Sequence, residues 1–142
     1  MYGSVRSAHE VLRAGAVGAA LSGIPSTVHA LVTGADVLVG AEAAGSLLLP
    51  WARRRALLVA AAGPVHVALS FGWATVLARV LPRRRPVAEG VLAGLAIAAL
   101  DLGVIGRRLP RIAALPQPPQ VADHIAYGVA VSVMLYRDAA VP

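Results

Sequence analysis

Apolar residues gather into four long runs, separated by shorter stretches that are rich in arginine, proline and polar residues. The runs cover about residues 12–33, 57–81, 87–106 and 121–137. Each is close to the roughly 17 to 25 residues that an α-helix needs to cross a bilayer. The pattern therefore predicts an all-α integral membrane four-helix bundle, formed as a single transmembrane domain over residues 1–142.

A shorter apolar pattern lies between the first two runs. Asp36 is suited to cap a helix there, and the apolar residues that follow fall on one side of it over about residues 36–49. A one-sided apolar pattern of this kind is typical of a helix that lies in the membrane interface. We expect a short interfacial helix between the first and second membrane helices.

The connections between the runs predict which helix ends lie together. Residues 81–86 form a short loop with two prolines, so the second and third helices should be antiparallel neighbours on the side that also carries both termini, here called face A. Residues 107–120 contain four prolines. This composition favours an extended connection on the opposite side, face B.

Composition agrees with a membrane location. Of the 142 residues 58% are apolar and only 14% are charged, whereas soluble domains have about 25% charged residues.

Small residues recur at intervals of four at Gly15, Ala19 and Gly23 and again at Gly90 and Gly94. These stripes predict close packing between helices.

All thirteen basic residues are arginines, and the net charge is +6. The arginines lie at the ends of the apolar runs, as anchors and topology signals do, so they indicate a membrane and not a nucleic acid as partner. Seven lie on face A and six on face B, and this small excess favours cytoplasmic termini. Two runs are candidates for binding lipid head groups: Arg53, Arg54 and Arg55, and Arg83, Arg84 and Arg85.

The chain has no cysteine, which excludes disulfides, thiolate metal sites and redox thiols. Any metal site must therefore use histidine and carboxylate ligands. The sequence also lacks a nucleophile elbow, a phosphate-binding loop and the zinc-protease spacing of histidines. These absences favour a protein that is not an enzyme, unless its chemistry runs through histidines.

Four ionisable residues lie inside four different apolar segments: His29, His66, Asp101 and His124. With the α-helical rise of about 1.5 Å per residue, all four fall in the leaflet of face B. Each such group costs roughly 2.5 to 3.5 kcal/mol to place in the hydrocarbon, so their common depth requires partners or a site. We expect them to form one cluster inside the bundle.

Other polar residues share a helix face with these groups or lie within one turn of them: Ser26, Ser70, Asp123 and Tyr127. Trp73 continues the face of the second helix that carries His66. Pro25 and Pro64 each remove a backbone hydrogen bond near a histidine, and the freed carbonyls are able to bind a proton, water or ion.

Four interpretations fit this cluster. Hydrogen bonds between helices would only specify packing, whereas three imidazoles and a carboxylate suit a transition metal such as zinc, iron or copper. The same groups suit a proton relay in which Asp101 exchanges protons, and two histidines suit a haem. The function expected first is metal or ligand binding by a small membrane protein that serves as an accessory subunit. The alternatives are proton-coupled transport of a small solute or a purely structural role.

Two segments, Ser22–Leu31 and Ala122–Gly128, carry a family resemblance. With the His-x-x-Tyr-Gly element at 124–128, they resemble small uncharacterised four-helix inner-membrane proteins of bacteria, mainly actinobacteria, of the YagU-like kind. The resemblance implies a multi-pass protein of the bacterial cytoplasmic membrane and transfers no catalytic residue. Its expected partners are the lipid bilayer and further copies of the chain or a larger membrane complex.

Overall fold

The computed structural model describes residues 6–82 and 84–139, and all regular secondary structure within these ranges is helical. The elements in chain order are α1 (Ala8–Ser22), α2 (Ile24–Thr33), α3 (Val39–Gly45), α4 (Arg55–Val80), α5 (Pro86–Leu100), the π-helix η1 (Asp101–Ile105), the 3-10 helix η2 (Gly106–Arg108), α6 (Pro110–Ala113) and α7 (Gln117–Ala139). The prediction of an all-α fold is confirmed for this part of the chain.

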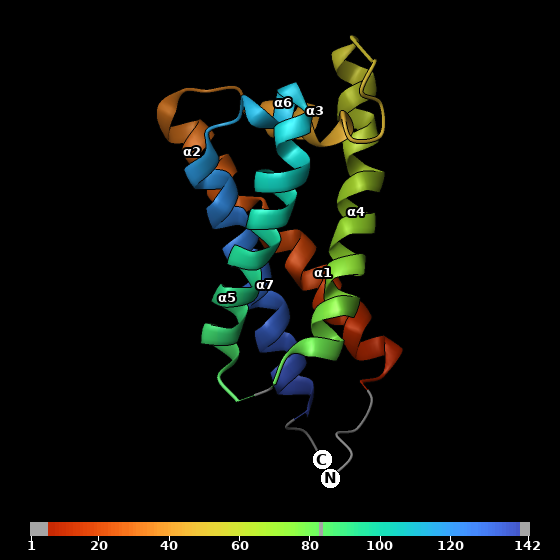
Figure 1. Cartoon of the computed structure of the whole chain (residues 1–142), viewed down its shortest axis with the longest axis vertical. Coiled ribbons are helices and arrows are strands. Elements are labelled where there is room, and N and C mark those ends of the chain that lie inside the picture. Colours follow the sequence, from red (N-terminus) through yellow and green to blue (C-terminus); the bar gives the residue numbers. More distant parts are fainter. Residues whose placement is uncertain (1–5, 83, 140–142) are drawn as a thin grey trace.

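The long helices lie side by side along the long axis of the molecule (Figure 1). The start of α1, the turn between α4 and α5 and the end of α7 lie at one end, and α3 and α6 lie at the other. Helix α7 packs against α1, α2 and α5, while α4 packs mainly against α1 and α3. These two ends correspond to faces A and B.

Three helical segments among the described residues are long and apolar enough to cross a membrane: Ala8–Thr33, Arg55–Val80 and Pro86–Arg108. They agree with the first three predicted segments. Many of their large apolar side chains are exposed, with Val32 81% and Leu92 67% accessible. The fourth predicted segment, within α7, has a polar first half and is enclosed by other helices.

The first predicted helix is broken at Gly23, where α1 ends and α2 begins. Pro25 lies in the first turn of α2, where its missing N–H group leaves no helical acceptor unpaired. At the break itself, the backbone amide of Gly23 bonds to the carbonyl of Leu21, two residues earlier. Pro64, by contrast, lies inside a continuous α4, so only one of the two proline-containing helices is interrupted.

The prediction of an extended connection over residues 107–120 is wrong. Pro110 starts the short helix α6, and α7 begins at Gln117 instead of near residue 121. Two prolines, Pro118 and Pro119, therefore lie in the first turn of α7. A proline is tolerated there because the first amides of a helix have no partner within it. The interfacial helix is also shorter than expected, since α3 covers only Val39–Gly45.

Helices α5 and α7 touch backbone to backbone, as Gly90 and Gly94 predicted. A Cβ atom added to Gly90 would lie 2.5 Å from the Cα of Val129, and one added to Gly94 would lie 2.6 Å from the Cα of Ile125. Gly128 of α7 faces the same two glycines. We call this contact the glycine seam (Gly90, Gly94 and Gly128). It fixes the register of α5 against α7.

The predicted small-residue stripe of the first helix is only partly used. Gly15 lies against the ring of Phe71, whereas Gly23 has no neighbour within 4 Å of a built Cβ atom. The stripe diverges at Gly23 because the helix breaks there. Below the break, the main core joins four helices through buried apolar side chains: Ala14, Ala74, Leu77, Ile97, Tyr127, Val131 and Leu135.

Candidate functional site

Asp101 begins the π-helical turn η1 at the end of α5. A π-turn widens a helix locally and is frequent near functional sites. The Asp101 side chain is 18% exposed. Its Oδ2 atom accepts a hydrogen bond of 3.2 Å from Nε1 of Trp73, which reaches across from α4. The carboxylate therefore links two membrane-length helices.

His124 of α7 is the second partner of Asp101. Its Nε2 atom lies 3.5 Å from Oδ2 of Asp101, and its side chain is 20% exposed. Its Nδ1 atom lies 2.8 Å from the carbonyl oxygen of Gln120, one turn earlier in the same helix. The glycine seam sets this pairing because Gly94 contacts the backbone of His124.

These hydrogen-bond partners determine which nitrogen of His124 carries a proton and how many protons the pair of Asp101 and His124 can hold. A carbonyl oxygen can only accept, so Nδ1 of His124 carries a proton and Nε2 faces the carboxylate. Without a further proton, the Nε2 lone pair faces a carboxylate oxygen. One added proton converts this contact into an attraction, either imidazolium to carboxylate or carboxylic acid to imidazole. The geometry is therefore suited to hold one exchangeable proton shared by two groups.

Trp73 and Gln120 complete this site, and neither was among the predicted site residues. Trp73 shares the inward face of α4 with His66 and Ser70, which is the signal in the sequence that could have identified it. Gln120 acts only through its backbone carbonyl. No side-chain pattern can reveal such a role, because every residue has that group.

Asp123, next to His124, has a different task. Its Oδ1 atom accepts a hydrogen bond of 2.9 Å from the backbone amide of Ser26. This amide lies in the first turn of α2, where the break in the helix leaves it without a helical acceptor. Asp123 thus caps α2 from another helix, an arrangement that the opposite charge of a helix N-terminus favours.

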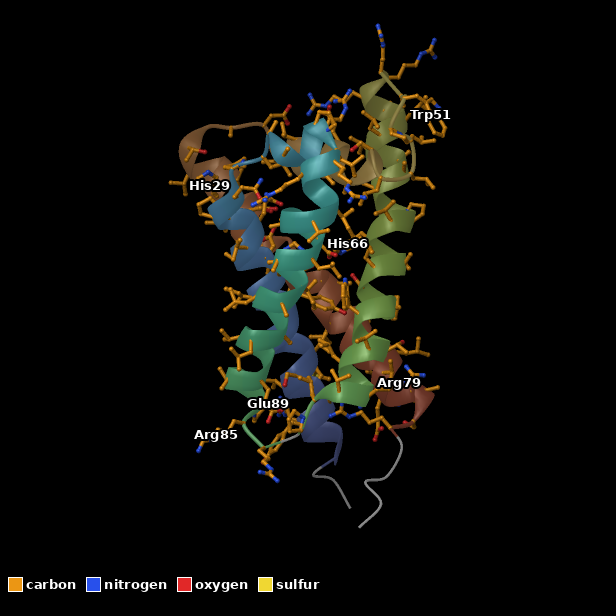
Figure 2. The ribbon with its side chains drawn as sticks, in the orientation of Figure 1. His29, Trp51, His66, Arg79, Arg85 and Glu89 are labelled. Carbon is orange, nitrogen blue, oxygen red and sulfur yellow. The ribbon has the colours of Figure 1, made fainter. Side chains whose placement is uncertain are left out.

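His66 binds the other side of the same break. Its Nε2 atom lies 2.9 Å from the carbonyl oxygen of Ala19, which the hydroxyl of Ser22 also contacts at 3.3 Å. A groove of about 320 Å³ opens beside His66 and is lined by α1 and α2. The carbonyl of Ala19 is open to this contact because the amide of Gly23, four residues later, bonds to Leu21. Figure 2 shows His66 on the side of α4 that faces the other helices.

His29 stands apart from the other predicted ligands. It is exposed on α2, at some distance from His66 in Figure 2. Its backbone carbonyl accepts a hydrogen bond from the hydroxyl of Thr33, and within the described residues its imidazole makes none. Within residues 6–82 and 84–139, no three His, Asp or Glu side chains are grouped closely enough to hold a metal ion. The structure thus pairs Asp101 with His124, brings His66 and Asp123 to the helix break, and leaves His29 outside.

The remaining two supporting residues form a buried bridge between α4 and α7. The hydroxyl group of Tyr127 donates a hydrogen bond to the backbone carbonyl of Ser70. Tyr127 also belongs to the main core, and Ser70 is buried. The bridge lies one helical turn from His124 and one from Trp73, so it holds α4 beside the Asp101 pair.

The arginine runs proposed for lipid head groups differ in their surroundings. Arg55 bonds to Asp36 and to Glu42, with 2.9 Å between its Nε and Oε1 of Glu42, so it ties α3 to α4. Arg53 and Arg54 are exposed beside Trp51 at face B. At face A, the backbone amides of Arg84 and Arg85 bond to Glu89, which leaves their side chains exposed. Arg83 lies outside the described residues.

Comparison with known proteins gives no relative from which a function could be transferred. No protein-family model, curated protein or solved structure matches this chain. The geometry of the Asp101 pair therefore carries the functional argument.

Proposed function

We propose that the chain is an integral membrane protein that crosses the bilayer four times, by α1–α2, α4, α5–η1–η2 and α7. Three of these segments have the length and hydropathy of membrane spans. The fourth, α7, is shielded on several sides by α1, α2 and α5, so that its polar first half faces protein. Arginines at both ends of the molecule suit contact with head groups on each side of the membrane.

The proposal places the protein in the cytoplasmic membrane of a bacterium, with both termini in the cytoplasm. It agrees with the resemblance to small YagU-like membrane proteins. The polar interior and the exposed apolar surface also suit assembly into an oligomer, since four helices enclose little space for a solute path. The bilayer is the first partner in each case.

Within this frame, the function that the geometry supports best is proton-coupled movement of a small solute, with Asp101 and His124 as the proton-binding pair. The supporting observation is the contact between Nε2 of His124 and Oδ2 of Asp101 inside the helix bundle. The pair has no net charge with its shared proton and one negative charge without it. In a low-dielectric interior this change is costly enough to move neighbouring groups, of which Trp73 is the first.

Proton binding suits this site better than metal binding does. Zinc sites in proteins use three or four protein ligands, whereas the further contacts of Asp101 and His124 are an indole N–H and a backbone carbonyl. An indole nitrogen that carries a proton is a donor and not a ligand. Haem binding is disfavoured for a related reason, because both imidazole nitrogens of His124 already have partners.

The test is proton flux into liposomes that contain the purified protein and a pH-sensitive dye. A potassium gradient with valinomycin sets an inside-negative potential, which drives protons inward. Asp101→Asn should abolish the protein-dependent flux because an amide cannot exchange the proton. Glu10→Gln is the matched control, since it makes the same chemical change at the exposed capping box of α1. Equal protein-dependent flux in Asp101→Asn and wild type would overturn the proton step.

A further inference from the structure

A second cavity lies at face B, beside the end of α5 and the start of α7. Its volume is about 490 Å³, which falls within the roughly 300 to 1,000 Å³ of ligand sites. It is open to the surroundings and lies among α5, η1, η2, α6 and α7, whose ends meet near α6 in Figure 1. The lining residues are Leu95, Ala98, Ala99, Leu102, Gly103, Arg107, Ala113, Gln117 and Val121.

The walls of this cavity are apolar, and its charge is of one sign. Arg107 is the one charged residue of the lining, and no acidic side chain lies beside it there. Within the described part of the chain, Arg107 has no salt bridge, whereas Arg55 and Arg111 at the same end are paired with carboxylates. Gln117 is already engaged, because its side-chain amide donates to the carbonyls of Ile112 and Leu115. The charged group that the cavity offers to a ligand is therefore the guanidinium of Arg107.

The apolar and charged parts follow one another along the helix axis. Leu95 lies near the middle of the span Pro86–Arg108, and Arg107 lies at its end. Twelve helical positions correspond to roughly 18 Å, which is close to half the thickness of the hydrocarbon core. From the membrane surface inward, the cavity thus presents a cation and then an apolar wall. A phospholipid presents its phosphate and then its acyl chain in the same order.

We propose that this cavity is a specific site for an anionic phospholipid, with the phosphate on Arg107 and one acyl chain along Leu95, Ala99 and Leu102. Guanidinium groups bind phosphate through charge-assisted hydrogen bonds, and the small side chains of Ala98, Ala99 and Gly103 leave the volume for the chain. The inference rests on the membrane placement proposed above, but not on the proton step.

The experiment uses delipidated protein in mild detergent and native mass spectrometry. The probes are phosphatidylglycerol and phosphatidylcholine with identical acyl chains, added at equal concentration. Wild type should retain one phosphatidylglycerol in preference to phosphatidylcholine. Arg107→Gln should weaken phosphatidylglycerol binding by about tenfold, because a charge-assisted bond is lost. Arg108→Gln is the matched control, since Arg108 is the exposed neighbour that does not line the cavity.

Two further measurements test whether the molecule bound in the cavity is a phospholipid with its acyl chain along the apolar wall. Ala99→Leu should fill the apolar wall and displace the lipid while Arg107 is intact. Glycerol 3-phosphate, which has the head-group chemistry without chains, should not compete. Equal losses in Arg107→Gln and Arg108→Gln, equal retention of the two lipids, or competition by glycerol 3-phosphate would each overturn the assignment. Flotation of wild type with alkali-washed liposomes checks membrane insertion by itself, so failure of the lipid site and failure of the membrane placement give different results.

Discussion

Asp101 contacts residues of two other helices, α7 and α4, and the two helices are held beside it by different kinds of contact. Helix α7 meets α5 along the glycine seam, where backbones touch and any added atom collides. Helix α4 packs mainly on α1 and α3, and it reaches Asp101 through the indole of Trp73. The distance between Asp101 and His124 is thus set by rigid packing, while the contact between Asp101 and α4 depends on one long side chain. A proton on the pair can therefore change the α4 contact more easily than it can move α7.

This comparison predicts the largest effect at Gly94. A valine there would place new atoms against the backbone of α7 at His124 and Ile125, so Gly94→Val should lower the free energy of unfolding by about 3 kcal/mol. The measurement is thermal unfolding in detergent, followed by circular dichroism. Gly72→Val in α4 is the control, because nothing lies within 4 Å of its built Cβ atom. Similar losses in both variants would show that the seam is not special.

A smaller effect is expected at Tyr127, which links α7 to α4. Tyr127→Phe removes the donor to the buried carbonyl of Ser70 and should cost about 1 to 2 kcal/mol. The same unfolding assay applies, and the exposed Tyr136→Phe should change stability by much less. If the two variants lose the same amount, the contact between α4 and α7 does not depend on this hydrogen bond.

Trp73 should separate stability from function. Trp73→Phe keeps an aromatic ring but removes the N–H group that bonds to Asp101, so the expected loss in stability is about 1 kcal/mol. The proton flux should change by a larger factor than this loss explains, because Asp101 loses its connection to α4. Trp51→Phe, at an exposed position, is the matched control. An unaltered flux in Trp73→Phe would show that this contact plays no part in proton movement.

The two attachments of Asp101 also differ in how far the sequence predicts them. The spacing of Gly90 and Gly94 indicates a close contact, because a four-residue interval places both on one helix face. The pairing of Asp101 with His124 agrees with their expected common depth. His29 has a similar expected depth, but after the break at Gly23 α2 packs on α7 and lies apart from α4 (Figure 1). The spacing of apolar residues does not reveal that change of direction. Depth along a helix is readable from the sequence, whereas rotation after a break depends on tertiary packing.

Local chemistry at the helix break was equally hard to foresee. The sequence indicates Asp123 only as a polar neighbour of His124, yet it caps α2 across an interhelical contact. Long-range caps of this kind need the position of both helices, because any nearby acceptor satisfies an amide. The start of α7 was misplaced for a simpler reason. Prolines end a helix when they lie inside it but are tolerated in its first turn, and the pattern at 116–119 did not distinguish these cases.

The smallest predicted effect concerns the ion pair between Asp36, in the turn before α3, and Arg55 at the start of α4, which is exposed and thus unlike both attachments of Asp101. The pKa of Asp36 lies below its ordinary value of 3.8, first because the Leu38 amide bonds to the carboxylate and then because Arg55 does. A carboxyl group with a lowered pKa in the folded state stabilises the protein above its unfolded pKa, and this contribution is lost as the pH falls through the folded pKa.

The melting temperature of wild type should therefore fall below about pH 4 by slightly more than that of Asp36→Asn, which has no carboxylate to protonate. Near neutral pH the variant should be slightly less stable than wild type, because it lacks the charge that attracts Arg55. High salt should reduce the difference, since exposed ion pairs are screened. The glycine seam contains no charge, so the loss caused by Gly94→Val should be independent of salt. Two results would contradict this ranking: a loss of stability in Gly94→Val that changes with salt, or a loss in Asp36→Asn as large as that in Gly94→Val. Either would show that close packing does not hold α7 more firmly than polar contacts hold α4.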